Sequence, residues 1–342
     1  MLVEIEFEIF DDAQYFDALD ELIWEFLHHR HQWEMNNYYR IQKSCWLEQE
    51  PRLSRRVEDL TKMYTASGYI TNKERHHKRI ITISRQPDNM SSFTPQDALE
   101  YLNAPVYIIV ENFESDKFFL KALIHAYKKK ALKRAFQKDW LRIEGAGGIG
   151  EIPKKIDDYV ENHQKFPHKL YIFVDSDREF PEDNHNAQPV LDKCAEKGID
   201  TITILYKRAI ENYLPLQALH AVQDELQHVY KAYKSLNHPD KWDYYDMKRG
   251  FEIRRINARP IYDRIPKKQE HLFGNIQEEN TPLFEALAHG FEAGREVKGF
   301  HLYTLFETQR DSVTKKALKI RCKHQPNPDE LEHLLEGIAS LL

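Results

Sequence analysis

Residues 105–111, with the sequence PVYIIVE, carry the clearest structural signal in the chain. The first six of them are mostly apolar and β-branched, which is typical of a strand buried on both faces of a parallel sheet. A second run of this kind covers residues 170–177, LYIFVDSD. Glu111 ends the first run, and Asp175 and Asp177 end the second. We therefore predict two buried strands that carry carboxylates at their C-terminal ends.

The sequence around these two runs alternates between helical and strand patterns. The further elements that we predict are helices at 115–136, with Ser115 as the N-cap, 152–163 and 189–197, strands at 141–144 and 201–205, and a glycine-rich turn, GAGGIG, at 145–150. Strands that alternate with helices imply right-handed crossovers and a parallel sheet with helices on both faces. Residues 104–214 are thus predicted to form an α/β domain.

The two flanking regions have mainly helical patterns. In residues 1–100 we predict strands near 2–9 and 78–84, with two long helices between them that are broken near Pro51. In residues 215–342 the predicted helices lie at about 215–236, 281–292, 300–309, 311–321 and 328–341. The predicted fold class is therefore α/β, a parallel sheet flanked by helices, with helical N-terminal and C-terminal regions.

Composition favours a globular protein of the reducing cytoplasm. The 342 residues are 41% hydrophobic, and apolar positions recur at helix and strand spacing. No stretch reaches about 18 apolar residues, and the N-terminal segment MLVEIEFEIFDD is acidic where a signal peptide is basic, so we expect neither a membrane segment nor export. The three cysteines, Cys45, Cys194 and Cys322, form no CxxC pair, which argues against a disulfide framework and a thiolate zinc site.

The carboxylates at the predicted strand ends form the candidate site. The C-terminal ends of parallel strands lie on one edge of a sheet, so Glu111, Asp175 and Asp177 are expected to converge there. Unpaired carboxylates in one place are electrostatically costly unless a cation neutralises them. Oxygen ligands without cysteine or histidine favour a hard ion, Mg²⁺ or Mn²⁺, which suits phosphate chemistry. The structural alternative is that single acids cap the following helices or lie in solvated loops.

The order of these motifs resembles the TOPRIM domain of metal-dependent nucleases, over residues 104–214. Both have a strand that ends in glutamate, a nearby SD pair, a second strand with a Gly-Gly turn and a third strand that ends in DxD. The resemblance implies a TOPRIM-like fold, with Glu111, Asp175 and Asp177 as metal ligands and Asp116 as a further candidate. The family pattern has glycine after the glutamate and aspartate four residues beyond it, whereas this chain has Asn112 and places Asp116 five residues on.

Two later segments resemble OLD-family nucleases and the AriB-like effectors of the PARIS anti-phage system. Residues 205–215, LYKRAIENYLP, place Glu211 one strand after the DxD pair, and the resemblance implies that Glu211 joins a second metal site. Residues 296–306, EVKGFHLYTLF, contain Lys298, where these enzymes carry a lysine that contacts phosphate. Read without the family, Glu211 is a carboxylate at a helix start and Lys298 is an exposed lysine.

The resemblance implies a metal-dependent endonuclease that cuts DNA or RNA and acts as the toxic effector of an anti-phage defence system. Lys298, or Lys207 and Arg208 near the fourth strand, would offset charge on the scissile phosphate. The formal net charge is −6, so the whole chain does not have the basic character of many nucleic-acid-binding domains. The basic segments that could contact phosphates lie at residues 128–134, 248–264 and 315–323.

Two other functions stay open at this point. A phosphatase or phosphotransferase of the haloacid-dehalogenase type would use Asp175 as nucleophile and Asp177 as acid, although that scheme places DxD on the first strand of the fold. A non-catalytic binding or sensor subunit would dock a partner through the aromatic N-terminal helices. The chain has no Walker motif, so an ATPase partner would be a separate protein. A homodimer also stays open.

Overall fold

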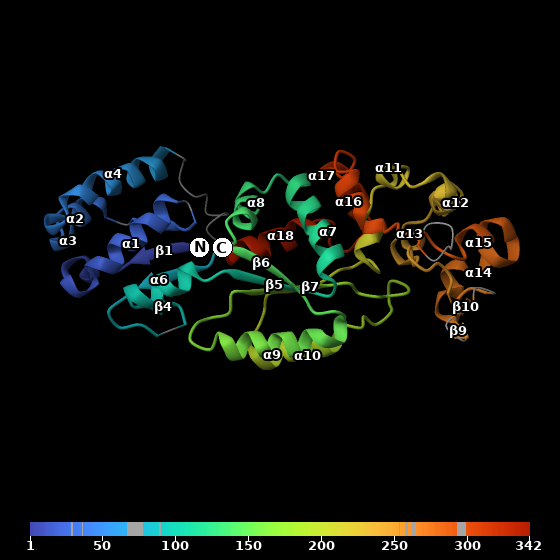
Figure 1. Cartoon of the computed structure of the whole chain (residues 1–342), viewed down its shortest axis with the longest axis horizontal. Coiled ribbons are helices and arrows are strands. Elements are labelled where there is room, and N and C mark those ends of the chain that lie inside the picture. Colours follow the sequence, from blue (N-terminus) through green and yellow to red (C-terminus); the bar gives the residue numbers. More distant parts are fainter. Residues whose placement is uncertain are drawn as a thin grey trace.

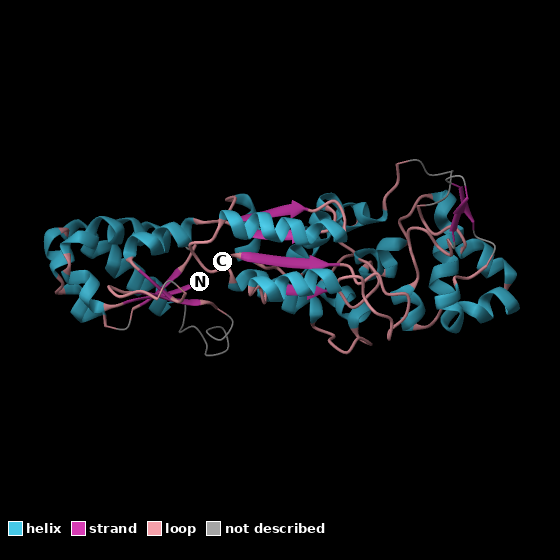
Figure 2. Cartoon of the chain, turned by 90° about the horizontal axis from the view of Figure 1, so that it is seen from below, coloured by secondary structure: helices cyan, strands magenta, loops and turns pink. Residues whose placement is uncertain are grey.

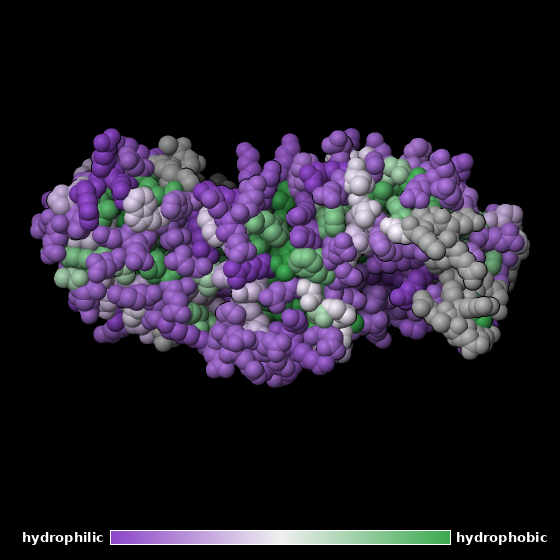
Figure 3. Space-filling view, in the orientation of Figure 1, coloured by the Kyte–Doolittle hydropathy of each residue, from purple (hydrophilic) through white to green (hydrophobic). Residues whose placement is uncertain are grey.

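The computed structural model of the chain describes residues 1–28, 30–35, 37–66, 78–88, 90–252, 254–256, 259–261, 264–292 and 299–342. Figure 1 shows an elongated molecule with an N-terminal unit at one end, a sheet in the middle and a mainly helical region at the other end. The N- and C-termini lie side by side near the middle. The surface is largely hydrophilic, with small apolar areas near the central sheet (Figure 3).

The central sheet has four parallel strands, which confirms the predicted α/β class. The strands are β5 (Val106–Val110), β6 (Leu141–Gly145), β7 (Leu170–Val174) and β8 (Ile202–Ile204). Their order across the sheet is β6-β5-β7-β8. All five residues of β7 are buried, as the continuous apolar run predicted.

Helices cover both faces of the central sheet (Figure 1). On one face lie α7 (Phe113–Ala126), α8 (Lys130–Gln137) and α18 (Glu330–Ser340), and on the other lie α9 (Ile152–Asn162) and α10 (Gln188–Lys197). The predicted single helix over residues 115–136 is wrong, because α7 and α8 are separated at Lys128, which has a left-handed backbone with φ of 53°. The N-cap is Asn112 instead of Ser115, since the Asn112 side chain accepts a hydrogen bond from the Glu114 N–H at 3.1 Å.

The N-terminal unit contains a second parallel sheet of four strands, where the sequence predicted one or two. Figure 2 shows the two sheets as separate groups of strands. The strand order is β2-β1-β3-β4, and the strands are β1 (Leu2–Ile5), β2 (Gln32–Glu34), β3 (Ile80–Ile83) and β4 (Ser92–Phe93). The helices of this unit are α1 (Phe16–Leu27), α2 (Tyr38–Gln42), α3 (Cys45–Gln49), α4 (Pro51–Ala66) and α6 (Pro95–Asn103).

The C-terminal region is mainly helical, as predicted, and also contains the antiparallel hairpin β9–β10. The described elements are α11 (Leu216–Leu219), α12 (Gln227–Ser235), α13 (Pro239–Tyr244), β9 (Arg254–Ile256), β10 (Arg259–Ile261), α14 (Glu270–Glu279), α15 (Thr281–Leu287), α16 (Leu305–Thr308), α17 (Lys315–Cys322) and α18. No helix among the described residues has both the length and the apolar character needed to cross a membrane.

One hydrophobic core joins the central sheet to the C-terminal region. Phe119 of α7, Phe306 of α16 and Leu334 of α18 belong to this core, and the rings of Phe119 and Phe306 are 5.2 Å apart. The N-terminal unit has a separate core around Trp46 and Phe26. The C-terminal helices are therefore part of the folded unit that positions the edge of the central sheet.

Candidate metal centre

The candidate site lies where β5 and β7 end side by side. From β5 the chain continues to β6 on one side, and it then returns to β7 on the other side of β5. The direction in which strands are added to the sheet therefore reverses between β5 and β7. Open α/β sheets bind ligands at such a switch point, outside the C-terminal ends of the strands. Glu111 directly follows β5 and Asp175 directly follows β7, so the structure places both residues at this edge, as the sequence predicted.

Two further carboxylates reach the same edge from other elements. Asp116 lies in the first turn of α7 and is 5% exposed, and Glu211 lies in the 3-10 turn Ile210–Tyr213 and is 1% exposed. Asp116 Oδ2 accepts a hydrogen bond from the Asn112 N–H at 2.8 Å. Asp175 Oδ1 accepts one from the Ile210 N–H at 3.0 Å, which joins the Glu211 turn to the end of β7.

The carboxyl groups raise one another's pKa values. Burial raises the pKa of Asp116 to about 7, and the charges of Glu211 and Glu111 add to this effect. Burial likewise raises the pKa of Asp175 well above its ordinary value, with further contributions from Asp116 and Glu211. The pKa values of Glu211 and Glu111 are also raised, first by burial. Burial and the neighbouring charges therefore favour the protonated forms of these carboxyl groups unless a positive charge lies beside them.

Lys248 is the positive group that faces this cluster. Its Nζ lies 3.0 Å from Glu211 Oε1. Burial lowers the pKa of Lys248, but the charges of Glu211 and Asp175 outweigh that effect and raise the pKa above its ordinary value. Glu292 also acts on Lys248, and its N–H donates to the Lys248 carbonyl at 3.1 Å. Neither Lys248 nor Glu292 was predicted from the sequence to be a site residue.

The glycine-rich turn after β6 is tied to the end of β5. The N–H groups of Gly147 and Gly148 donate to the Glu111 carbonyl at 3.0 and 3.2 Å. Both glycines have positive φ, 85° and 136°, which favours glycine over residues with a side chain. These bonds hold the backbone of Glu111 beside the turn, so the glycines shape the rim of the site.

The other residues that the sequence predicted for the site do not all lie at this edge of the sheet. Asp177 is partly exposed, has a left-handed backbone with φ of 53°, and donates its N–H to the Arg208 carbonyl at 3.0 Å. Lys298 lies outside the described residues. Arg208 pairs with Asp246 at 3.0 Å. Lys207 cannot contact a phosphate as proposed from the sequence, because its side chain is 0% exposed and forms an ion pair with Asp243.

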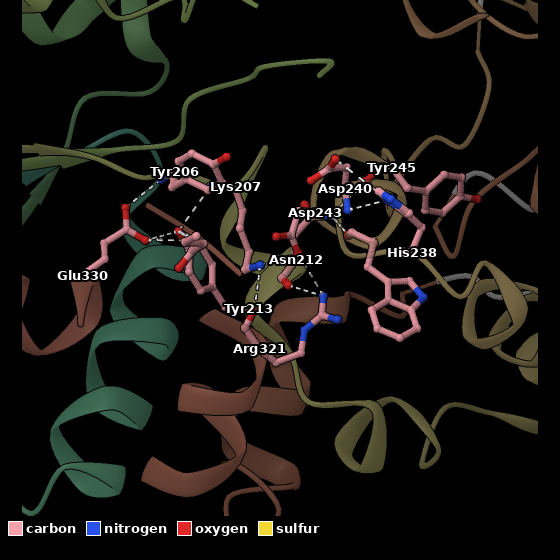
Figure 4. A network of polar contacts seen from close by, with 12 residues as sticks. Tyr206, Lys207, Asn212, Tyr213, His238, Asp240, Asp243, Tyr245, Arg321 and Glu330 are labelled. Carbon is pink, nitrogen blue, oxygen red and sulfur yellow. Dashed lines mark hydrogen bonds and ion pairs between the residues drawn. The ribbon is translucent and has the colours of Figure 1, made fainter. Parts of the chain in front are cut away.

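Lys207 belongs instead to a buried polar network behind the Glu211 turn (Figure 4). Lys207 Nζ donates to the Arg321 carbonyl at 3.0 Å, and Arg321 Nη2 donates to the Asn212 carbonyl at 2.5 Å. The Asn212 side chain donates to the carbonyls of Trp242 and Tyr245 at 2.8 and 3.0 Å. The network therefore holds the residue next to Glu211 against α13 and α17.

The donor set fits a hard divalent ion in its chemistry. All the acidic candidates would bind an ion through carboxylate oxygens. Both oxygens of the buried Glu211 carboxylate lack a hydrogen-bond partner among the described residues, although this carboxylate forms an ion pair with Lys248. Within the described part of the chain, however, no three histidine, cysteine or acidic side chains converge closely enough to hold a metal.

Comparison with known proteins finds no match. No family model matches the chain, and no curated protein and no solved structure shows significant similarity to it.

In the metal-free protein, the contribution of Asp116 to stability is expected to fall as the pH rises from about 4 to about 7. Asp116 has a folded-state pKa of about 7 against an ordinary value of 3.8, so the folded chain binds this proton more tightly than the unfolded chain does. Its contribution to the free energy of unfolding is complete below pH 3.8 and is lost as the pH passes 7. Thermal unfolding in EDTA measures this slope, which the Asp116→Asn variant should reduce; equal slopes in both proteins would contradict the assignment.

Replacing Lys248 with methionine is expected to destabilise the metal-free protein by about 2 kcal/mol, because Glu211 loses its counter-charge while it remains buried. The same change should increase the rise in unfolding temperature that Mn²⁺ produces, since a cation then has no ammonium to displace. Thermal unfolding with and without Mn²⁺ measures both effects. Lys268→Met is the control, because Lys268 is exposed and its nearest acid, Asp183, lies 3.7 Å away. If Mn²⁺ raises the unfolding temperature of Lys248→Met only as much as that of wild type, Lys248 does not lie at the metal site.

Proposed function

We propose that the chain is a divalent-metal-dependent nuclease that cleaves phosphodiester bonds of DNA or RNA. The observation that carries this proposal is the group of carboxylates at the switch point of the central sheet, whose pKa values are raised by burial and by one another. Such a group requires a cation, and its oxygen-only chemistry favours Mg²⁺ or Mn²⁺. Phosphodiester cleavage is a common use of such a site.

In this proposal, Glu111, Asp175 and Asp177 hold one ion, and Glu211 and Asp116 help to hold a second. When bound, the metal would supply an activated water and stabilise charge on the scissile phosphate. The ammonium of Lys248 lies beside Glu211 and has no other described acid within ion-pair distance, so it is placed to offset charge on a phosphate at this edge of the sheet. Lys298 remains a second candidate for this role.

The resemblance to the AriB-like effectors extends the proposal to a biological setting. The nuclease would be the toxic effector of an anti-phage defence system, and a separate ATPase would restrain or trigger it. A partner or a second copy of the chain would supply that trigger.

The haloacid-dehalogenase alternative is less well supported. That scheme places its DxD pair after the first strand of the fold, whereas Asp175 and Asp177 follow β7, the third strand of the central sheet along the chain. Detection of a phosphorylated Asp175 would reverse this preference. A non-catalytic binding subunit remains the second candidate, because no three ligands converge among the described residues.

The direct test is incubation of the purified chain with plasmid DNA and with total RNA, in Mg²⁺, in Mn²⁺ and in EDTA. Metal-dependent cutting of either substrate would support the nuclease and identify its substrate class. A folded protein that binds Mn²⁺ but cuts nothing would support the non-catalytic subunit or an effector that needs its partner.

A further inference from the structure

The outer face of α7 carries a regular row of exposed and half-buried side chains. Phe113, Lys117, Lys121 and His125 are spaced four residues apart, which places them along one face of the helix. Phe113 is 47% exposed, and Lys121 and His125 are exposed. The row begins two residues after Glu111, so one of its ends lies at the candidate metal centre. We call these four residues the α7 row.

The other end of the α7 row opens into a basic hollow. A cavity of about 240 Å³ is lined by Lys121 and His125 of α7, Lys133 of α8, Arg310 after α16, and the apolar side chains of Ile124 and Phe136. No carboxylate lines this hollow among the described residues.

The cations of the hollow have little local compensation. Neither Lys121 nor Lys133 has an acidic partner within 4.0 Å in the described part of the chain, and Arg310 has only the exposed Glu307 at 3.8 Å. Elsewhere on the surface, lysines such as Lys193 and Lys165 each pair with two acids. The hollow therefore concentrates positive charge and attracts an anion.

The spacing of the row suits a polynucleotide. From Phe113 to His125 the helix rises about 18 Å, at about 1.5 Å for each residue. Phosphates of one DNA strand follow one another at about 3.4 Å along a duplex axis and farther apart in an extended strand, so several phosphates can lie over this length. Lys117 Nζ lies 4.6 Å from the centre of the Phe113 ring. The end of the row nearest the carboxylates therefore offers both a cation and an aromatic ring.

We propose that the α7 row is the track that binds a single polynucleotide strand leading to the site of cleavage. Phe113 stacks on a base next to the scissile phosphate, Lys117 and Lys121 contact successive phosphates, and the basic hollow holds a phosphate farther along the same strand. This inference rests on the proposed nuclease function and names the surface that guides the substrate strand to the cleavage site. The contacts carry no sequence preference, because phosphates and the faces of bases are common to all strands.

The test measures binding of fluorescent oligo(dT) and oligo(U) of 20 nucleotides to the full chain in EDTA, where no cutting interferes. The Lys121→Gln/Lys133→Gln variant is expected to bind about tenfold more weakly, and the slope of log affinity against log salt should fall by about 1.4, at about 0.7 for each phosphate that is no longer neutralised. Phe113→Leu should weaken binding about fivefold or more and leave the salt slope unchanged, because stacking involves no counterion release.

The matched control is Lys231→Gln/Lys234→Gln, which removes two exposed lysines of α12, outside the α7 row. This control should change affinity by less than about twofold. All substituted side chains are exposed, and circular dichroism melting verifies that each variant folds. Equal losses in the control and in the α7 variants would overturn the proposal, and so would wild-type affinity in both α7 variants.

The same proteins distinguish this inference from the proposed function. Wild-type protein that cuts nucleic acid in Mg²⁺, with α7 variants that bind and cut like wild type, would overturn the track and leave the nuclease intact. Strand binding that depends on the α7 row, without cutting in any metal, would support the track and point to the non-catalytic subunit or to an effector that needs its partner. A wild-type chain that neither binds nor cuts would overturn the track.

Discussion

Replacing Asp175 with asparagine is expected to reduce metal-dependent cleavage by about a thousandfold or more. Asp175 directly follows the central buried strand β7, and burial raises its pKa, with further contributions from the charges of Asp116, Glu211 and Glu111. Asparagine keeps the oxygen that accepts the Ile210 N–H but loses the negative charge that holds a hard cation. A bound ion supplies several kcal/mol of charge stabilisation, and each 1.36 kcal/mol corresponds to tenfold in rate. Rates of cutting on the substrate that wild type cleaves measure this loss.

Stability separates this effect from simple misfolding. Because the pKa of Asp175 is raised by burial, removing its charge should raise the unfolding temperature of the metal-free protein while activity disappears. The matched control is Asp200→Asn, since Asp200 is exposed and precedes β8 at the opposite edge of the same sheet. Cleavage by Asp175→Asn within about tenfold of wild type would remove this residue from the metal site.

The part of the site that the sequence predicted depends on local pattern and one topological rule. The runs before Glu111 and Asp175 are continuously apolar, and β5 and β7 are buried parallel neighbours. Parallel strands share an edge, so acids after two such runs come together without further information. Glu211 was predicted as a site residue only through the family resemblance, because the short turn that carries it has no periodicity of its own.

Lys248 and Glu292 could not be placed from the sequence, because packing between two distant loops positions them. A side chain on Gly250 would meet the Ala288 carbonyl at 2.3 Å, and one on Gly290 would meet the Lys248 carbonyl at 2.7 Å. Both glycines have positive φ, 64° and 63°. The sequence indicates a turn at each of these glycines, but it does not indicate that the two turns contact each other.

The N-terminal sheet escaped prediction for a related reason. Its strands β2 and β4 have three and two residues, too few for alternation to be recognised. Their pairing is also distant along the chain, with Leu2 opposite both Gln32 and Ile80. Short strands of this kind depend on the sheet that they join.

Lys207 shows the limit of placing a charged side chain from its neighbours in sequence. Its position beside Arg208, after the fourth strand, favoured a role at the phosphate, whereas Asp243 pairs with it in the interior. Replacing Lys207 with methionine is expected to lower the free energy of unfolding by about 3–5 kcal/mol, because Asp243 and Arg321 lose a buried partner. Urea denaturation measures this change.

An exposed pair provides the control for this prediction. Lys319→Met removes the partner of Asp329, 2.9 Å away at the surface, and should cost less than about 1 kcal/mol. Without Lys207, Arg321 at 3.8 Å is the remaining cation beside Asp243 among the described residues. If the cost at Lys207 comes from this weaker compensation of Asp243, the double variant Lys207→Met/Asp243→Asn should recover most of it, because Arg321 keeps its hydrogen bonds to Asn212 and Tyr233. A double variant no more stable than Lys207→Met would place the cost in the missing hydrogen bonds of Lys207 itself. In either case the turn that carries Glu211 loses part of its support, so both variants should also weaken Mn²⁺ binding.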